Sequence, residues 1–211
     1  MIISIDVVTG ERKLVSDNTR GTGDDLVAPA SLSMGADHIL YVADNSSSKI
    51  LAVDTATGNR SALASSLTGA YGINKPSHLV ADTQAKNRLF VLANASNNYI
   101  LQLNLAATPV TSSLVSDSGN SLQGSTRLYT APKGIALAAS LNSLFVADSI
   151  SDLVKVDIAT GNRTEFLETE GRYSPIGYDT QKQLLYLVDG IFPGLFVVDP
   201  VTAQKVLISR D

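Results

Sequence analysis

Acidic and amide side chains end four short apolar segments of the chain and could together hold a metal ion. These four residues are Asp44, Asn94, Asp148 and Asp189. Carboxylate and amide oxygens are ligands that Ca²⁺ prefers, so their convergence on a central channel would create a calcium-type site. An acid at the end of a strand also caps the following turn, and this structural role is the competing interpretation.

A second series of acidic and amide residues marks an internal repeat. Its members, called anchors below, are Asp6, Asp54, Asn104, Asp157 and Asp199, which are 48, 50, 53 and 42 positions apart. The segment "LAVDTATGNR", from Leu51 to Arg60, returns as "VKVDIATGNR", from Val154 to Arg163. In Asp-x-x-Thr-Gly the carboxylate accepts hydrogen bonds from turn amides, and the glycine takes a positive φ. Turn formation therefore explains this series better than an array of metal ligands does.

A basic residue stands six positions after four of the anchors. These residues are Arg12, Arg60, Arg163 and Lys205. We expect each of them to lie near its anchor carboxylate, at the outer corner of the repeat.

A period near fifty residues predicts a repeat architecture, and each repeat reads as four short strands. The first strand follows a proline, at Pro29, Pro76, Pro132 and Pro175. The second strand ends at Asp44, Asn94, Asp148 or Asp189. The third strands cover residues 2–5, 50–53, 100–103, 153–156 and 195–198, and the fourth strands end at Ser16, Ser65, Ser116, Glu168 and Ser209. Four antiparallel strands per repeat without helical periodicity predict an all-β fold, a β-propeller.

The strand count predicts about four and a half blades in a single propeller domain, residues 1–211. Residues 1–28 form an outer half-blade and a loop, and the blades cover residues 29–75, 76–131, 132–174 and 175–211. A propeller usually closes by sharing one blade between its two ends, so this count predicts an open or incomplete ring. Three explanations are open: part of a larger propeller, which we favour, completion by a second copy, or an open arc. Uncovered ring edges also predict self-association.

The segments "APKGIALAASLNSLFVADSISDLVKVD", residues 131–157, and "HILYVADNSSSKILAVD", residues 38–54, resemble NHL repeats. The blades are also similar in style to those of six-bladed propellers of the SMP-30/gluconolactonase type. This resemblance implies varied binding roles and, in some branches, a metal-dependent lactonase or esterase. Those enzymes hold their channel metal with a glutamate at an inner strand. The glutamates of this chain, Glu11, Glu165, Glu168 and Glu170, do not begin an inner strand, so no catalytic residue is carried over.

Long connections between blades, at residues 17–28, 66–75, 117–131 and 169–174, predict where a ligand binds. We expect ligand contacts from Arg20, Asp24, Asp25, Tyr71, His78, Arg127, Tyr129 and Arg172. His78 begins an inner strand, either as a ligand or proton-transfer group or as a hydrogen-bonded residue lining a wet channel. The predicted function is a non-catalytic binding or scaffold module for a protein, peptide or glycan. The alternative is a Ca²⁺-dependent lactonase-like hydrolase.

Composition and charge exclude several classes of function. The net charge of −4 without a basic cluster argues against nucleic-acid binding. No apolar segment approaches the ~20 residues that span a bilayer. The chain has no cysteine, which excludes disulfides and thiolate chemistry. The N-terminus lacks a signal-peptide pattern. The sequence leaves the compartment open, with a bacterial parent protein that is periplasmic or secreted as one alternative.

Overall fold

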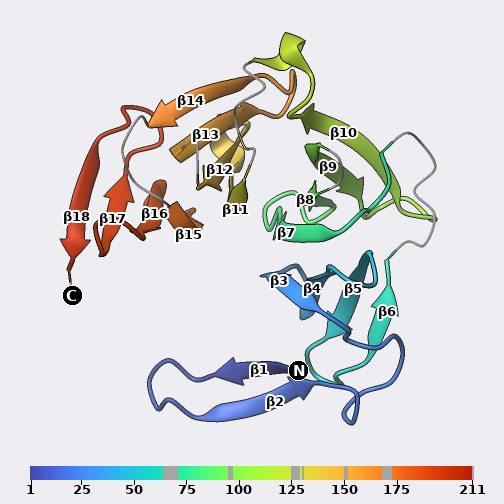
Figure 1. The fold of residues 1–211 in the computed structure, drawn as a ribbon. Helices are drawn as coiled ribbons and strands as arrows, with labels where there is room; N and C mark the ends of the chain where they lie inside the picture. The colour runs from blue at the N-terminus through green and yellow to red at the C-terminus, as the bar shows by residue number, and fades with distance from the viewer. Residues whose placement is uncertain are drawn as a thin grey trace. The chain divides into compact units, whose positions relative to one another are not determined.

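The computed structural model describes residues 1–63, 71–94, 97–124, 129, 131–149, 152–167 and 173–210. Its strands form one two-stranded and four four-stranded antiparallel sheets (Figure 1). The half-blade contains β1 (Ile2–Ile5) and β2 (Arg12–Ser16). Blade 1 contains β3 (Pro29–Met34), β4 (Ile39–Asp44), β5 (Lys49–Asp54) and β6 (Arg60–Ala62), and blade 2 contains β7 (Pro76–Ala81), β8 (Arg88–Asn94), β9 (Asn98–Asn104) and β10 (Thr111–Asp117). Blade 3 contains β11 (Pro132–Ala138), β12 (Ser143–Asp148), β13 (Asp152–Asp157) and β14 (Arg163–Leu167), and blade 4 contains β15 (Tyr173–Asp179), β16 (Leu184–Asp189), β17 (Gly194–Val198) and β18 (Lys205–Ser209).

The all-β fold of four blades and one half-blade is confirmed, with strands in sequence order across each sheet. Two single 3₁₀ turns, η1 (Ser121–Gln123) and η2 (Ala139–Leu141), interrupt the connections. The first strands extend further than expected, since β15 begins two residues before Pro175. In the described part of the chain, no helix has the length and apolar character needed to cross a bilayer.

The chain groups into two compact units. The first holds residues 1–93 and 102–112, and the second holds residues 94–101 and 113–211. The boundaries predicted for a single propeller domain stay a prediction.

The repeated Asp-x-x-Thr-Gly segments form the predicted turns. The Asp54 carboxylate accepts hydrogen bonds from the backbone N–H groups of Ala56, at 2.8 Å, and Thr57, at 2.9 Å. Gly58 follows with φ +82°, where a side chain would be strained. The Asp157 carboxylate accepts equivalent bonds from the hydroxyl and the backbone N–H of Thr160. The anchors are therefore turn acceptors, as the sequence predicted.

These turn hydrogen bonds make the free energy of unfolding depend on pH. Bonds from Thr57 and Ala56 lower the pKa of Asp54 below its ordinary 3.8, and bonds from Thr160 lower that of Asp157. A lowered folded-state pKa adds stability that is present above the unfolded pKa and is lost as pH falls through the folded pKa. We therefore expect urea unfolding midpoints to be level above about pH 5 and to fall below about pH 4. Asp157→Asn should reduce this dependence, whereas Asp25→Asn, at an exposed loop position, should leave it unchanged.

The basic residues of the repeat do not take the expected place beside the anchor. Arg60 is buried and reaches back to the half-blade, where its Nη1 donates to Ser16 Oγ and to the Asp17 carbonyl, each at 2.7 Å. Ser16 Oγ in turn donates to the carbonyl of Gly58 at 2.7 Å. We call this arrangement an interblade arginine contact. It binds the fourth strand of one sheet to the turn of the next sheet.

The same contact joins blade 2 to blade 3. Arg163 is buried, and its Nη1 donates to Ser116 Oγ at 3.2 Å and to the Asp117 carbonyl. Its Nη2 donates to the carbonyls of Asn120, at 2.7 Å, and Gly124, at 3.2 Å. Ser116 Oγ donates to the Gly161 carbonyl at 2.7 Å, as Ser16 does to Gly58. A guanidinium supplies enough donors for all of these acceptors, which explains why arginine stands here.

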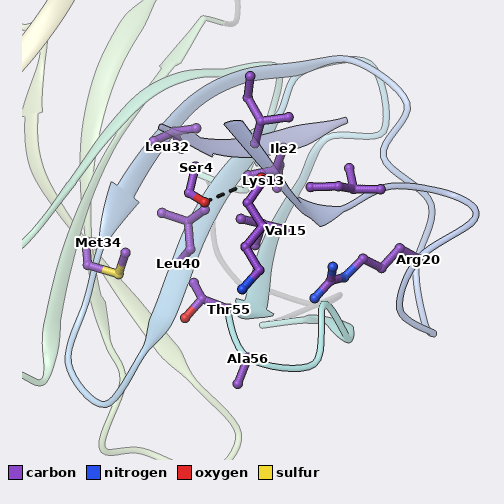
Figure 2. Close-up of a pocket in the computed structure, with 12 residues that line it drawn as sticks. Ile2, Ser4, Lys13, Val15, Arg20, Leu32, Met34, Leu40, Thr55 and Ala56 are labelled. Carbon is purple, nitrogen blue, oxygen red and sulfur yellow. Dashed lines mark hydrogen bonds between the residues drawn. The ribbon is translucent and has the colours of Figure 1, made fainter. Parts of the chain in front are cut away.

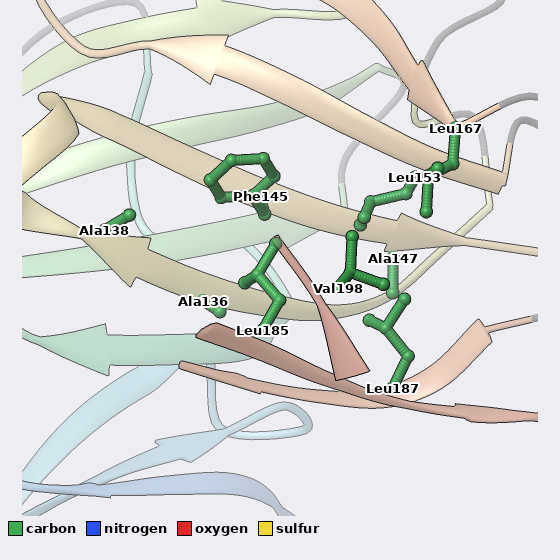
Figure 3. Packing of buried hydrophobic residues seen from close by; sticks show 9 residues of the cluster. All are labelled: Ala136, Ala138, Phe145, Ala147, Leu153, Leu167, Leu185, Leu187 and Val198. Atoms are coloured by element: carbon green, nitrogen blue, oxygen red, sulfur yellow. The ribbon is translucent and has the colours of Figure 1, made fainter. Parts of the chain in front are cut away.

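Apolar side chains fill the space between blades 3 and 4. Figure 3 shows Phe145 and Leu153 from blade 3 above Leu185, Leu187 and Val198 from blade 4. All five side chains are fully buried. A second apolar cluster joins the half-blade to blade 1; it contains Ile2, Val15, Leu26, Leu40, Val42, Leu51 and Val53. Apolar packing between neighbouring sheets therefore forms the core, both between the half-blade and blade 1 and between blades 3 and 4.

Candidate functional site

A pocket of about 490 Å³ lies between the half-blade and blade 1 (Figure 2). Its lining is mostly apolar and consists of Ile2, Ile3, Ser4, Lys13, Leu14, Val15, Arg20, Leu32, Met34, Leu40, Thr55 and Ala56. This volume falls in the range of ligand pockets, about 300–1,000 Å³. Its floor continues the apolar cluster between these two sheets, because Ile2, Val15 and Leu40 belong to both.

One side of the pocket is the edge of β1. In the described structure β1 pairs with β2 alone, at Ile3↔Leu14, Ser4↔Lys13 and Ile5↔Arg12. The corresponding strand of blade 1, β5, pairs with β4 on one side and β6 on the other, and its Leu51 and Val53 are fully buried. Ile3 and Ile5 occupy the same positions in β1 and are exposed. β1 therefore presents backbone groups and apolar side chains to which another strand can add.

The opposite side of the pocket is the face of β3. Leu32 is 58 % exposed and Met34 is 52 % exposed. In blade 2 the corresponding residues, Leu79 and Ala81, are buried because β7 packs against β3. Hydrogen bonds from the Leu79 and Ala81 backbones to serine hydroxyls of β3 complete that contact. Within the described residues no strand pair covers Leu32 and Met34 of β3 in the same way, and the pocket lies at this uncovered face.

Two cationic side chains and three small residues complete the lining of the pocket beside its larger apolar residues. Lys13 and Arg20 line the pocket together with Ser4, Thr55 and Ala56. Ser4 Oγ donates to the Lys13 carbonyl at 3.4 Å, as the dashed line in Figure 2 shows. Arg20 is one of the predicted ligand residues. The pocket can thus bury apolar groups and attract an anionic one.

The other predicted ligand residues of the first unit lie elsewhere. Asp24 forms an ion pair with Lys49 and accepts a hydrogen bond from the Ala62 backbone, and the Lys49 bond lowers the pKa of Asp24. Asp24 therefore fastens its loop to blade 1, while Asp25 is exposed. His78 is partly buried in β7, with Nδ1 3.2 Å from Ser77 Oγ, and Tyr71 is partly buried. None of these four residues lines the pocket.

Tyr129, which was predicted to contact a ligand, is a core residue of the second unit. Its side chain is fully buried, its hydroxyl donates to Ser116 Oγ at 2.8 Å, and the Arg163 guanidinium lies 5.4 Å from its ring centroid. Burial raises the pKa of the Tyr129 hydroxyl to about 12. Tyr129 thus supports the interblade arginine contact from within the core. Arg127 and Arg172, the other two predicted ligands, lie outside the described residues.

The acids that end the second strands bind backbone and hydroxyl donors. Both Asp44 oxygens are engaged, one by Val27 and Ala28 N–H and the other by the backbone and hydroxyl of Ser47. Burial raises the pKa of Asp44, but these hydrogen bonds outweigh burial and hold it below 3.8.

The remaining second-strand acids follow the same pattern. Asp148 accepts from the Ala131 backbone, and Asp189 accepts from Ile191 and Phe192. Asn94, the amide of this series, ends β8 and is partly buried. Within the described residues, no group of three His, Cys, Asp or Glu side chains has a metal-binding arrangement. The cation interpretation of these four residues stays a prediction.

The apolar lining of the pocket was not predicted from the sequence. Ile3, Leu32 and Met34 look like ordinary core residues, because burial depends on which sheet covers them. The signal that could have found them was the match of residues 2–16 to a third and a fourth strand alone, since two strands cover less of the neighbouring sheet than four do.

Comparisons with known proteins support the fold. Neither a protein-family model nor a curated protein matches the chain. A chain in the crystal structure of a nidogen/laminin complex is similar, with a TM-score of 0.72 and 15 % identity over 97 % of this chain and 69 % of that one. A protein of unknown function from Bacteroides thetaiotaomicron VPI-5482 is similar with a TM-score of 0.66 and 12 % identity, over 92 % of this chain and 48 % of that one. The chain therefore has a β-propeller fold and spans about half the length of the second protein, whereas its resemblance to NHL repeats and SMP-30-like propellers stays a prediction.

Proposed function

We propose that the chain is a non-catalytic binding module whose ligand is an extended segment of a protein or peptide. The observation that carries this proposal is the uncovered edge of β1 beside the apolar pocket. Strand addition to a sheet edge gives affinity through backbone hydrogen bonds and specificity through pockets for alternate side chains. Of the loop residues expected to contact a protein, peptide or glycan, Arg20 lines this pocket, so the proposal places the ligand here. The similar fold in a nidogen/laminin complex, an assembly of proteins, is in keeping with protein binding.

The complete blades indicate what such a segment looks like. In blade 1, Val42 lies opposite Leu51 and Tyr41 lies opposite Ala52. In blade 4, Leu187 lies opposite Phe196 and Tyr186 opposite Val197. By the same register, a strand antiparallel to β1 places an aliphatic residue opposite Ile3 and an aromatic residue opposite Ser4. The ligand we expect is therefore a segment with the pattern Leu-aromatic-aliphatic, as in Leu40-Tyr41-Val42 and Leu185-Tyr186-Leu187.

Charge adds a second element of specificity. Lys13 and Arg20 are the ionisable side chains of the pocket lining, and both are cationic. A carboxylate on the ligand therefore gains a favourable interaction that added salt weakens.

A fluorescent peptide with the sequence of residues 39–45, "ILYVADN", is the direct probe of this site. We expect it to bind saturably in an anisotropy titration. Met34→Glu should weaken binding at least about tenfold, because a carboxylate then replaces apolar surface in the pocket. Leu122→Glu is the matched control, since Leu122 is exposed on η1 outside the pocket. Equal affinity for both variants, or a scrambled peptide that binds as tightly, would show that the pocket is not the binding site.

A further inference from the structure

The two interblade arginine contacts follow a pairing rule between successive sheets. In each contact a serine of the fourth strand meets an arginine six residues after the next anchor: Ser16 meets Arg60, and Ser116 meets Arg163. Ser16 occupies the place opposite Ile2, the first residue of its third strand. We call this place the acceptor position.

Where the acceptor position lacks serine, the following sheet lacks arginine. In blade 3 the acceptor position is Leu167, opposite Leu153, and blade 4 supplies Lys205. The Lys205 ammonium lies 4.7 Å from the ring centroid of Phe196, within its own blade. The acceptor position of blade 1 lies outside the described residues, and blade 2 has Val110 six residues after its anchor Asn104. Within the described residues, serine thus occurs with arginine at two junctions, and the apolar Leu167 occurs without it.

One serine at an acceptor position and one arginine six residues after an anchor form no such contact within the described residues. Their positions in the repeat are those of a bonded pair. The acceptor position of blade 4 is Ser209, opposite Leu195 in the same register. The arginine of the half-blade is Arg12, six residues after Asp6. Both residues are exposed, whereas Ser16, Ser116, Arg60 and Arg163 are buried.

The surfaces around these two residues are preformed and uncovered. Val15 and Val115 precede the two bonded serines and are buried, whereas Ile208, which precedes Ser209, is 52 % exposed. The turn before Arg12 already has the required form, with Asp6 accepting bonds from Val8 and Thr9 and Gly10 at φ +73°. A Cβ on Gly58 or Gly161 would collide with the carbonyl oxygen of Val15 or Val115, whereas a Cβ on Gly10 would meet no atom within 4 Å.

The charges next to the two residues are also complementary. Glu11 precedes Arg12, where neutral Asn59 and Asn162 precede the bonded arginines. Arg210 follows Ser209, where Asp17 and Asp117 follow the bonded serines. Opposite charges therefore accompany this serine and this arginine and favour their pairing.

We propose that the Asp6–Arg12 turn of one copy of the chain docks on β18 of a second copy. The Arg12 guanidinium then donates to Ser209 Oγ and to the carbonyl that follows it, as Arg60 and Arg163 do within the chain. Gly10 lies against the Ile208 carbonyl, and Val206, Leu207 and Ile208 lose their exposure to water. The two surfaces differ, so the contact is heterologous and each copy can bind one copy at each end.

Sedimentation equilibrium over a concentration series tests this contact on the whole chain. The wild-type average mass should rise with concentration beyond that of a dimer. Arg12→Ala and Ser209→Leu should each raise the dissociation constant at least about tenfold, because both residues lie at the centre of the contact. Lys133→Ala, which removes an equal charge from an exposed residue of β11, should leave association unchanged.

Mixing the two variants makes the test specific. Arg12→Ala keeps a competent β18, and Ser209→Leu keeps a competent turn, so an equimolar mixture should form a heterodimer that grows no further. A wild-type chain that is monomeric at every concentration, as when the contact closes within one copy, would overturn the proposal. Association that survives in both variants would overturn it too, by assigning self-association to another surface.

Discussion

Replacing Arg163 with alanine is expected to lower the free energy of unfolding by roughly 3 kcal/mol or more. The buried guanidinium donates to Ser116 Oγ and to the carbonyls of Asp117, Asn120 and Gly124. Each buried acceptor left without a donor costs about 1–3 kcal/mol. The Tyr129 ring also loses its stacked cation. Urea unfolding followed by circular dichroism measures the change.

The chain contains a matched control for this substitution. Lys205 occupies the same repeat position, but its ammonium lies over Phe196 within its own sheet. Lys205→Ala should therefore cost less than about 1 kcal/mol. Arg163→Lys should recover only part of the loss, because an ammonium cannot reach several divergent carbonyls. A double-mutant cycle with Ser116→Ala should show coupling between the two side chains. Equal losses for Arg163→Ala and Lys205→Ala would contradict the structural role of the interblade arginine contact.

Gly58→Val is expected to destabilise the chain by about 3–5 kcal/mol, through backbone strain and overpacking together. Gly58 has φ +82°, and a Cβ there would lie 2.5 Å from the Val15 carbonyl oxygen. A backbone oxygen of the neighbouring sheet cannot move away without breaking the contact between the two sheets. The whole half-blade would have to shift.

Gly10→Val separates the two causes. Gly10 has φ +73°, but a Cβ there would meet no atom within 4 Å. Its cost should be that of strain alone, about 1–2 kcal/mol. Ala203 stands at the same turn position with φ +61°, so a small side chain is tolerated where nothing presses on it. If Gly10→Val and Gly58→Val were equally costly, the neighbouring carbonyl would not matter.

Local chemistry explains which parts of the structure could be predicted. The Asp54 turn depends on residues within four positions of each other, so its Asp-x-x-Thr-Gly sequence was sufficient. The strands around it have a short apolar pattern bounded by turns, and their order within each sheet followed from the repeat.

The parts that could not be predicted depend on neighbouring sheets. Arg60 was expected at its own anchor but crosses to Ser16, 44 positions earlier in the chain. Tyr129 looked like a loop residue and is instead buried against Arg163. The available signal was the segment "LVSD", which occurs at residues 14–17 and 114–117, each time one repeat before "TGNR". Reading these two segments as a pair would have located the interblade arginine contact.

The pairing rule has a consequence for how such a chain can change its length during evolution. Serine meets arginine at two junctions, whereas Leu167 of blade 3 meets no arginine of blade 4, so the junctions between sheets are not equivalent. Duplicating blade 3 alone would bring the arginine of the new copy against Leu167, where no hydroxyl accepts it. Duplicating blades 1 and 2 together would bring a new Arg60 against Ser116, and both partners would be correct. Duplication of this pair of blades would therefore keep every serine–arginine contact, whereas duplication of blade 3 alone would bury a guanidinium without its serine acceptor.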